Sequence, residues 1–164
     1  ISYGFRKPAL FVVEDVAPNM MMVGRSPQYS NLVVTTGLLD RVQRPELEGL
    51  IAHELSRSRN RISYLEGALA ILVAWPWSFI PTLVEKVSAK FIDPWSIAEI
   101  DIAAVGLTRY PPGLGKALES IHSDGREPTH NPRFCRHMWI NPPSEPLVVT
   151  GFSTNDRIAA LEEL

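Results

Sequence analysis

The pair His53-Glu54 is the part of this sequence with the clearest capacity for chemistry. In the motif H-E-x-x-H, two histidines four residues apart lie about 40° round a helix axis, so both imidazoles can bind one zinc ion. The glutamate beside the first histidine then polarises a zinc-bound water as general base. Here the run reads His-Glu-Leu-Ser-Arg, and Arg57 stands where the second histidine would be.

A rigid helix must carry such a motif, and the surrounding pattern predicts one. Pro45 suits the first turn of a helix. Apolar residues then recur at steps of three and four, which indicates one buried stripe; they are Leu47, Leu50, Ile51 and Leu55. We therefore expect a helix from Pro45 to about Asn60.

Short strands are expected before that helix and further helices after it. Three runs rich in β-forming residues predict a small antiparallel sheet, at 8–14, 20–24 and 32–36. A short helical segment is expected at 38–42, and longer helices at 95–108, 111–122 and 154–164, the last with Thr154 as its N-cap. This order, strands and then helices, predicts an α+β fold in a single domain over 1–164.

Composition excludes some functions. The chain has 164 residues with net charge −2, a balance that offers no electrostatic footprint for nucleic acid. The one cysteine, Cys135, rules out an internal disulfide. The chain opens on Ile1 without a basic start or a cleavage site, so we expect a piece of a longer protein, truncated at its N-terminus.

The stretch 65–84 bears on membrane contact. It holds twenty residues with Glu66 as the only charge, which just reaches the length of a membrane-spanning helix. Pro76 and Pro81 would break or kink that helix. A membrane span, a kinked hairpin on a membrane or partner, and a core helix all remain open.

Further motifs accompany the His-Glu pair along the chain, at 17–19, 24–27, 34–39, 46–56, 60–61, 101–108, 117–121 and 157–161. Together these segments closely resemble the HtpX family of membrane-associated zinc endopeptidases, distant relatives of the CAAX prenyl proteases. The resemblance implies a zincin-like metallopeptidase domain whose active-site helix lies around 45–60. It also implies membrane association, because the family places an apolar hairpin after the first metal helix, where 65–84 falls.

Carried over one residue at a time, the family's metal site is incomplete. The resemblance makes His53 the first ligand and Glu54 the general base, whereas Arg57 occupies the position of the second ligand. The third ligand is a glutamate in the family, and Ile97 stands there. Asp101 matches an aspartate near the metal. Glu99 would project from nearly the opposite side of its helix and cannot replace the missing glutamate.

These substitutions argue against zinc, so no cofactor is expected. A guanidinium has no lone pair for a metal, and one imidazole does not hold zinc alone. Arg57 is either a solvated arginine beside Arg59 and Arg61 or a cation replacing the zinc charge near Glu54 and Asp101. Rescue by a substitute ligand is a further alternative, for which the unassigned histidines are His122, His130 and His137.

Three hypotheses about function are consistent with these residues. The leading hypothesis is a pseudoenzyme, a protease scaffold kept as a binding or assembly subunit, whose sheet edge could still add a peptide strand from a partner protein. The second is an active membrane-associated zinc endopeptidase with a non-standard ligand set. The third is a structural subunit of a membrane complex. Each predicts a protein partner or a membrane, and a membrane-associated location.

Overall fold

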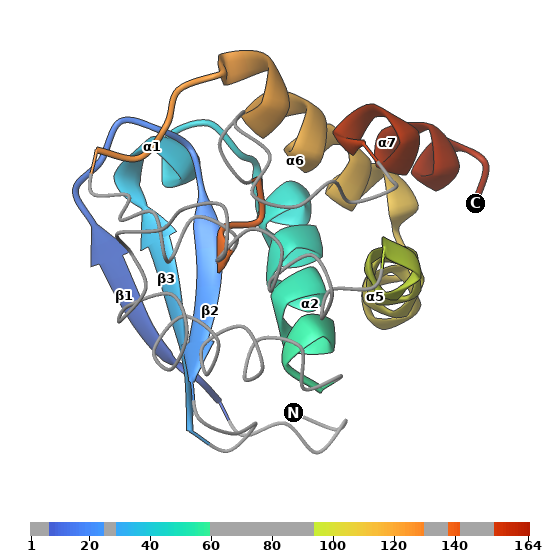
Figure 1. Ribbon diagram of the computed structural model, residues 1–164, viewed down its shortest axis with the longest axis horizontal. Helices are drawn as coiled ribbons and strands as arrows, with labels where there is room; N and C mark the ends of the chain where they lie inside the picture. The colour runs from blue at the N-terminus through green and yellow to red at the C-terminus, as the bar shows by residue number, and fades with distance from the viewer. Residues whose placement is uncertain (1–6, 25–28, 60–93, 130–137, 142–152) are drawn as a thin grey trace, which may run out of the picture.

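The computed structural model describes residues 7–24, 29–59, 94–129, 138–141 and 153–164. The apolar stretch 65–84 and the side chains of His130, Cys135 and His137 lie outside these residues, so the expectations placed on them stay predictions. Figure 1 shows the described elements as a small sheet with helices beside it.

Three strands form one mixed sheet in the order β1-β3-β2 (Figure 1). They are β1 (Ala9–Val13), β2 (Met20–Gly24) and β3 (Ser30–Thr35). β2 pairs antiparallel with β3, as expected, but β1 pairs parallel with β3, so the prediction of a wholly antiparallel sheet was wrong. The sequence between β1 and β2 makes no tight hairpin, because it is fixed to the end of β3. Gly37 N–H donates to the Asp15 carbonyl at 2.8 Å, and Asn19 N–H donates to Thr35 Oγ1 at 2.9 Å.

Five helices lie within the described residues, and their bounds follow the predictions to within a few residues. They are α1 (Thr36–Leu39), α2 (Arg44–Arg59), α5 (Pro94–Thr108), α6 (Pro111–Asp124) and α7 (Thr154–Glu162). The helix expected at 38–42 begins two residues earlier. Ser153, rather than Thr154, caps α7, since its hydroxyl accepts from Asp156 N–H while the Asp156 carboxylate accepts from Ser153 N–H. The α+β class is thus confirmed.

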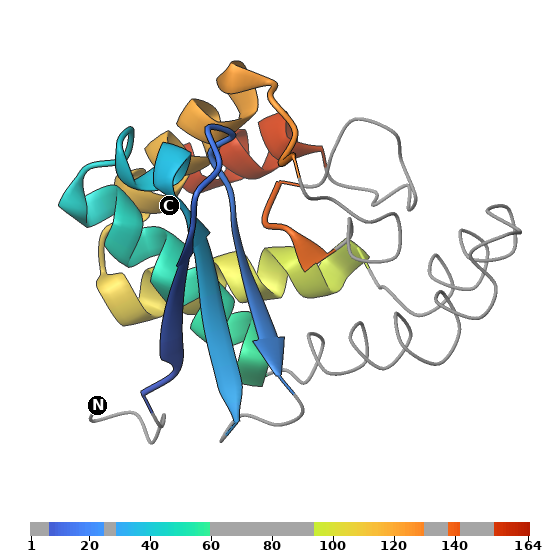
Figure 2. The same cartoon turned by 90° about the vertical axis from the view of Figure 1, so that its left-hand side faces the viewer.

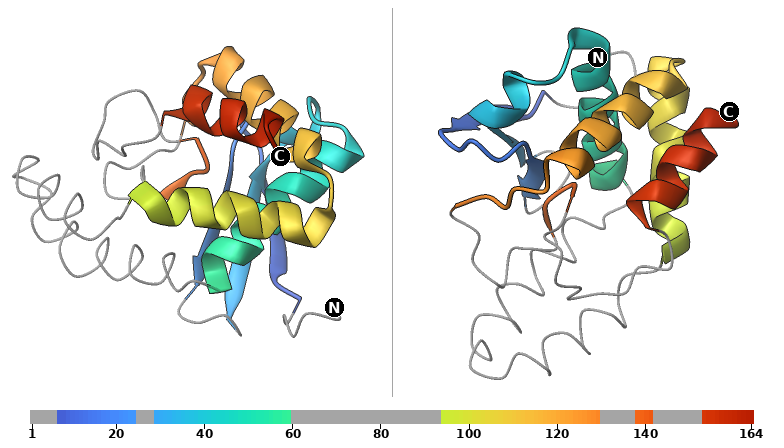
Figure 3. Two further views of the ribbon diagram at one scale, coloured as in Figure 1. Left: turned by 90° about the vertical axis from the view of Figure 1, so that its right-hand side faces the viewer. Right: turned by 90° about the horizontal axis from the view of Figure 1, so that it is seen from above.

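The long helices cover one face of the sheet (Figure 3), and α2 forms the centre of the packing against β2, α5 and α6. A fully buried core joins the inner face of the sheet to these helices, with Met20, Met22, Val34, Leu50, Leu114 and Leu118 among its members. α2 and α6 approach closely at Gly49, where an added Cβ would stand 2.8 Å from the backbone nitrogen of Leu114. Gly49 therefore lets α2 sit deep enough to bring its polar residues into the core.

None of the helices in the part of the chain that the structure describes is long and apolar enough to cross a membrane.

Candidate functional site

The three residues of the incomplete motif lie on the buried face of α2. His53 is 4% exposed, Glu54 0% and Arg57 6%. The helix that positions them starts with the Glu46 carboxylate accepting from Gln43 N–H at 2.7 Å and ends with basic residues, as the helix dipole favours. The alternative of a solvated Arg57 is thereby excluded, because its side chain lies inside the protein.

Glu54 and Arg57 form an ion pair in the core. Nη1 of Arg57 lies 3.5 Å from Oε1 of Glu54. No group within the described residues meets hydrogen-bond geometry with either Glu54 oxygen, so the carboxylate is stabilised by nearby charge and dipoles. Burial alone raises the pKa of Glu54, but the Arg57 charge, His53 and the backbone of Met22 outweigh it and hold that pKa below its ordinary value. Glu54 is therefore an ionised carboxylate at neutral pH.

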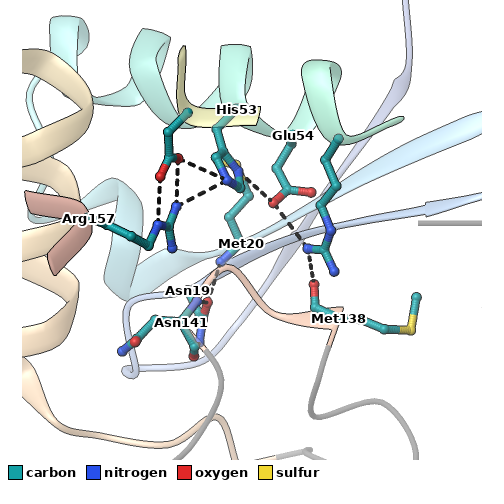
Figure 4. Close-up of polar contacts among 9 residues, drawn as sticks. Asn19, Met20, His53, Glu54, Met138, Asn141 and Arg157 are labelled. Carbon is teal, nitrogen blue, oxygen red and sulfur yellow. Dashed lines mark hydrogen bonds and ion pairs between the residues drawn. The ribbon is translucent and has the colours of Figure 1, made fainter. Parts of the chain in front are cut away.

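The same guanidinium reaches a second chain segment. Nη1 of Arg57 donates to the backbone carbonyl of Met138 at 2.9 Å (Figure 4). Arg57 thus links the Glu54 carboxylate to a carbonyl 81 residues later in the chain. An arginine presents several N–H donors from one plane, which suits it to hold two acceptors at once.

A second arginine completes the other half of the site. Arg157, on α7, donates from Nε and Nη2 to the two carboxylate oxygens of Asp101, on α5, both at 2.8 Å. Nη2 of Arg157 also lies 3.1 Å from Nε2 of His53, and Figure 4 shows its guanidinium directed at that ring. This two-point contact joins α7 and α5 to the His-Glu pair of α2.

Protein groups face both ring nitrogens of His53. A guanidinium only donates hydrogen bonds, so the contact with Arg157 is a hydrogen bond when Nε2 offers its lone pair and Nδ1 carries the proton. Nδ1 then faces Oε1 of Glu54 at 3.5 Å, and Nε2 also lies 3.3 Å from Oδ1 of Asp101. In that tautomer, the Nε2 lone pair that a metal would need is directed at Arg157.

The sheet edge beside α2 is covered by residues 138–141. Met21 and Trp139 form an antiparallel bridge, and Ile140 N–H donates to the Met20 carbonyl at 2.8 Å. Asn19, itself buried, binds the Asn141 carbonyl through Nδ2 at 2.9 Å (Figure 4). The chain therefore lays its own backbone along β2, where a peptide partner had been expected to add a strand. A partner strand on β2 would have to displace these residues.

The structure brings together most of the residues singled out from the sequence. His53 joins Glu54 to Asp101 where α2 packs against α5, and Arg57 pairs with Glu54. The guanidinium on Asp101 is that of Arg157. Ile97 lies one helical turn before Asp101 and is half-buried, whereas Glu99 is exposed, in agreement with its expected direction. His122 is exposed near the end of α6 and takes no part in the site.

Arg157 and Asn19 are the site residues that sequence reasoning missed. Both lie in segments that carry the resemblance, yet neither had been given a role. The sequence held one signal for Arg157: it precedes Leu161 by four residues, which places the two side chains on one face of a helix. In the structure both side chains are buried on α7. No local pattern pointed to Asn19.

Among the residues that the structure describes, the donor set does not fit the zinc ion that the resemblance implies. Arg57 offers no lone pair at the second ligand position, and His53 directs Nε2 at Arg157. Within the five described stretches of chain, no three His, Cys, Asp or Glu side chains are placed so that they could share a metal ion.

A His-Glu pair on a helix beside a sheet edge, in an α+β domain, agrees with the class that the family match shows, a metallopeptidase-like protein. The chain belongs to peptidase family M48, whose sequence model, "Peptidase family M48", matches residues 2–91.

Three relatives illustrate the similarity, and each is called "Protease HtpX homolog". The protein of Dictyoglomus turgidum is 30% identical, over 74% of this chain and 50% of its own length. Those of Tropheryma whipplei (strain Twist) and Thermoanaerobacter pseudethanolicus are each 27% identical over 100% of this chain, and over 69% and 68% of their own lengths. The chain thus spans between half and about two thirds of these relatives. No solved structure matches it significantly.

Proposed function

We propose that this chain is a member of family M48 that does not cut peptides and instead serves as a binding or assembly subunit. The observation that carries the proposal is the position of Arg57, buried between the Glu54 carboxylate and the Met138 carbonyl. In this proposal a guanidinium takes the place of the metal. Glu54 is a former general base, His53 a former ligand, and Asp101 keeps a structural role.

Charge supports the proposal. The described residues of the site include two carboxylates, Glu54 and Asp101, and two guanidinium groups, Arg57 and Arg157. With a neutral His53, the charges of these described groups sum to zero. Buried charge is stable only when it is compensated. A zinc ion would add two positive charges beside two arginines. By the resemblance, replacing a neutral histidine with Arg57 and a glutamate with Ile97 adds two positive charges, the amount that loss of zinc removes.

Elemental analysis combined with a peptidase assay tests the proposal. The full chain, incubated with zinc and desalted, is expected to retain well under one zinc per chain and to leave unfolded casein intact. About one zinc per chain, together with casein cleavage that Glu54→Gln abolishes, would overturn it.

The same measurement also tests the second candidate function, an active zinc endopeptidase with a non-standard ligand set. The retained, adjacent His53 and Glu54 favour it, as do the names of the relatives.

Membrane association is part of the proposal, for the binding subunit and for a structural subunit of a membrane complex alike. It is supported by the resemblance and by the composition of 65–84. The full chain is expected to float with vesicles of phosphatidylcholine and phosphatidylglycerol. Recovery of all protein in the soluble fraction would contradict it.

A further inference from the structure

The two edges of the sheet differ in what covers them. The β2 edge is closed by residues 138–141 through the Met21–Trp139 bridge. The other edge is β1, and no described strand pairs with its outer side. A strand that pairs on one side only presents a row of free N–H and C=O groups, a ready template for another strand. Among the described residues, the free edge for strand addition is therefore β1.

β1 is apolar and exposed on both faces. Leu10 is 62% exposed, Phe11 53% and Val12 53%. Leu10 and Val12 lie in register with the buried Leu32 and Val34, yet they stay exposed because α2 packs against β2 at the far side of the sheet. Figure 2 looks onto the opposite face, where no described helix covers the strands.

Natural edge strands usually carry charged residues, a proline or a bulge that prevents pairing. Residues 9–13 of β1 carry none of these: they read Ala-Leu-Phe-Val-Val in a continuous run. Pro8 stands directly before the strand, outside the five residues that would pair, with Lys7 before it. Glu14 and Asp15 follow the other end. The strand therefore has a positively charged end and a negatively charged end, and this difference decides which partner fits.

We infer that β1 is an interface for a second copy of this chain, in which two β1 strands pair antiparallel about Phe11. This register sets Phe11 opposite Phe11 of the other copy and Leu10 opposite its Val12. Two three-stranded sheets then form one sheet of six strands about a two-fold axis, an isologous contact. The inference does not depend on whether the metallopeptidase-like site is active, because that site lies beside β2.

Charge favours this arrangement over the parallel one. In antiparallel pairing about Phe11, Lys7 of each copy lies opposite Asp15 and next to Glu14 of the other copy. Asp15 is buried, so the exposed Glu14 is the charge that Lys7 can reach, and ends of opposite charge meet twice. Parallel pairing would place Lys7 beside Lys7 and Glu14 beside Glu14, which is destabilising. The side chains of Lys7 and Glu14 are both exposed, so neither has to leave the core to make the contact.

The faces of the sheet also match. Phe11 lies in register with Val33 of β3, and Val33 with Met21 of β2, so these three side chains form one row on the outer face. The two-fold axis, perpendicular to the sheet, continues this row into the second copy through the Phe11–Phe11 contact. Aromatic pairs at such positions are among the stabilising cross-strand contacts.

Sedimentation of the full chain tests the inference. Wild-type protein is expected to form a dimer in a concentration-dependent manner. Phe11→Lys, which sets two ammonium groups against each other at the axis, should raise the dimer dissociation constant by about tenfold or more. The matched control is Val16→Lys, at a site 66% exposed and outside the strand, which should leave the constant unchanged. Both positions are exposed, so the fold tolerates either change.

Two further experiments test which residues of the two β1 strands face each other. Lys7→Glu should weaken the dimer, and adding Glu14→Lys should restore part of the affinity. In a Cys135→Ser background, Phe11→Cys should oxidise to a disulfide-linked dimer, whereas Val16→Cys should not. A wild-type chain that stays monomeric at about 100 μM would overturn the inference. Equal cross-linking at both positions would also overturn it. So would a monomer that binds neutral phosphatidylcholine vesicles and is released by Phe11→Lys, which would make β1 a lipid contact.

Discussion

Arg57 donates from Nη1 to the carbonyl oxygen of Met138 at 2.9 Å, and the same nitrogen lies 3.5 Å from Oε1 of Glu54. One buried cation therefore serves two acceptors that belong to different parts of the chain. Its removal would leave both a carboxylate and a carbonyl uncompensated inside the protein, and the predictions about the site follow from that.

Arg57→Met should lower the free energy of unfolding by about 3–5 kcal/mol, because it leaves the Glu54 charge buried without its partner. Adding Glu54→Gln removes that charge, so the double variant should be more stable than Arg57→Met alone. Urea denaturation of the wild type, both single variants and the double variant gives the coupling energy. Strictly additive effects would show that the two side chains do not form a working ion pair.

Arg57→His combined with Ile97→Glu should create zinc binding. The two changes take the charge of the site from zero to −2, which a zinc ion neutralises, and they supply the two ligand types that the resemblance places there. We expect about one zinc per chain and a thermal midpoint that rises on zinc addition, with no such rise in wild type. Arg57→His alone is the control. A folded double variant without zinc would mean that the backbone of α2 and α5 no longer matches the family's geometry.

Arg157→Met should destabilise the protein by about 3–5 kcal/mol and expose α7 to hydrogen exchange, because Asp101 would lose both of its hydrogen bonds in the core. Arg126→Met is the matched control. Arg126 also makes a two-point contact with a carboxylate, Asp124, but its guanidinium is exposed, so its loss should matter far less. Equal losses in the two variants would contradict the importance of burial.

Two glycine substitutions should have opposite signs. Gly49→Ala should destabilise by about 1–3 kcal/mol, because its Cβ would meet the backbone of Leu114 on α6. Gly106→Ala, on α5, meets nothing within 4 Å and should stabilise the helix by about 0.5–1 kcal/mol. Thermal unfolding of the two variants measures both effects. Destabilisation by Gly106→Ala would show that the α5 surface is more crowded than its packing indicates.

The helices were predictable because each depends on local periodicity and local end signals. The buried stripe around Leu50 gave α2 its position, and the proline before Leu114 gave α6 its start. The parallel pairing of β1 was not predictable in this way, since it depends on hydrogen bonds that hold the connecting loop to Thr35.

The site, too, was predictable only where it depends on residues close together in the sequence. His53, Glu54 and Arg57 are recognised by their spacing on one helix. The contact of His53 with Arg157 spans 104 residues, and nothing in the local sequence indicates it. Two interpretations of Arg57 were open from the sequence, and its burial in the packed interior rules out the solvated one.

The two ion pairs have a consequence for how this core folds. Glu54 and Arg57 are one turn apart on α2, so they can meet early, whereas Asp101 and Arg157 come from segments 56 residues apart. The Asp101–Arg157 pair can therefore form only when α5 and α7 have come together, so it secures a later step of assembly than the pair within α2.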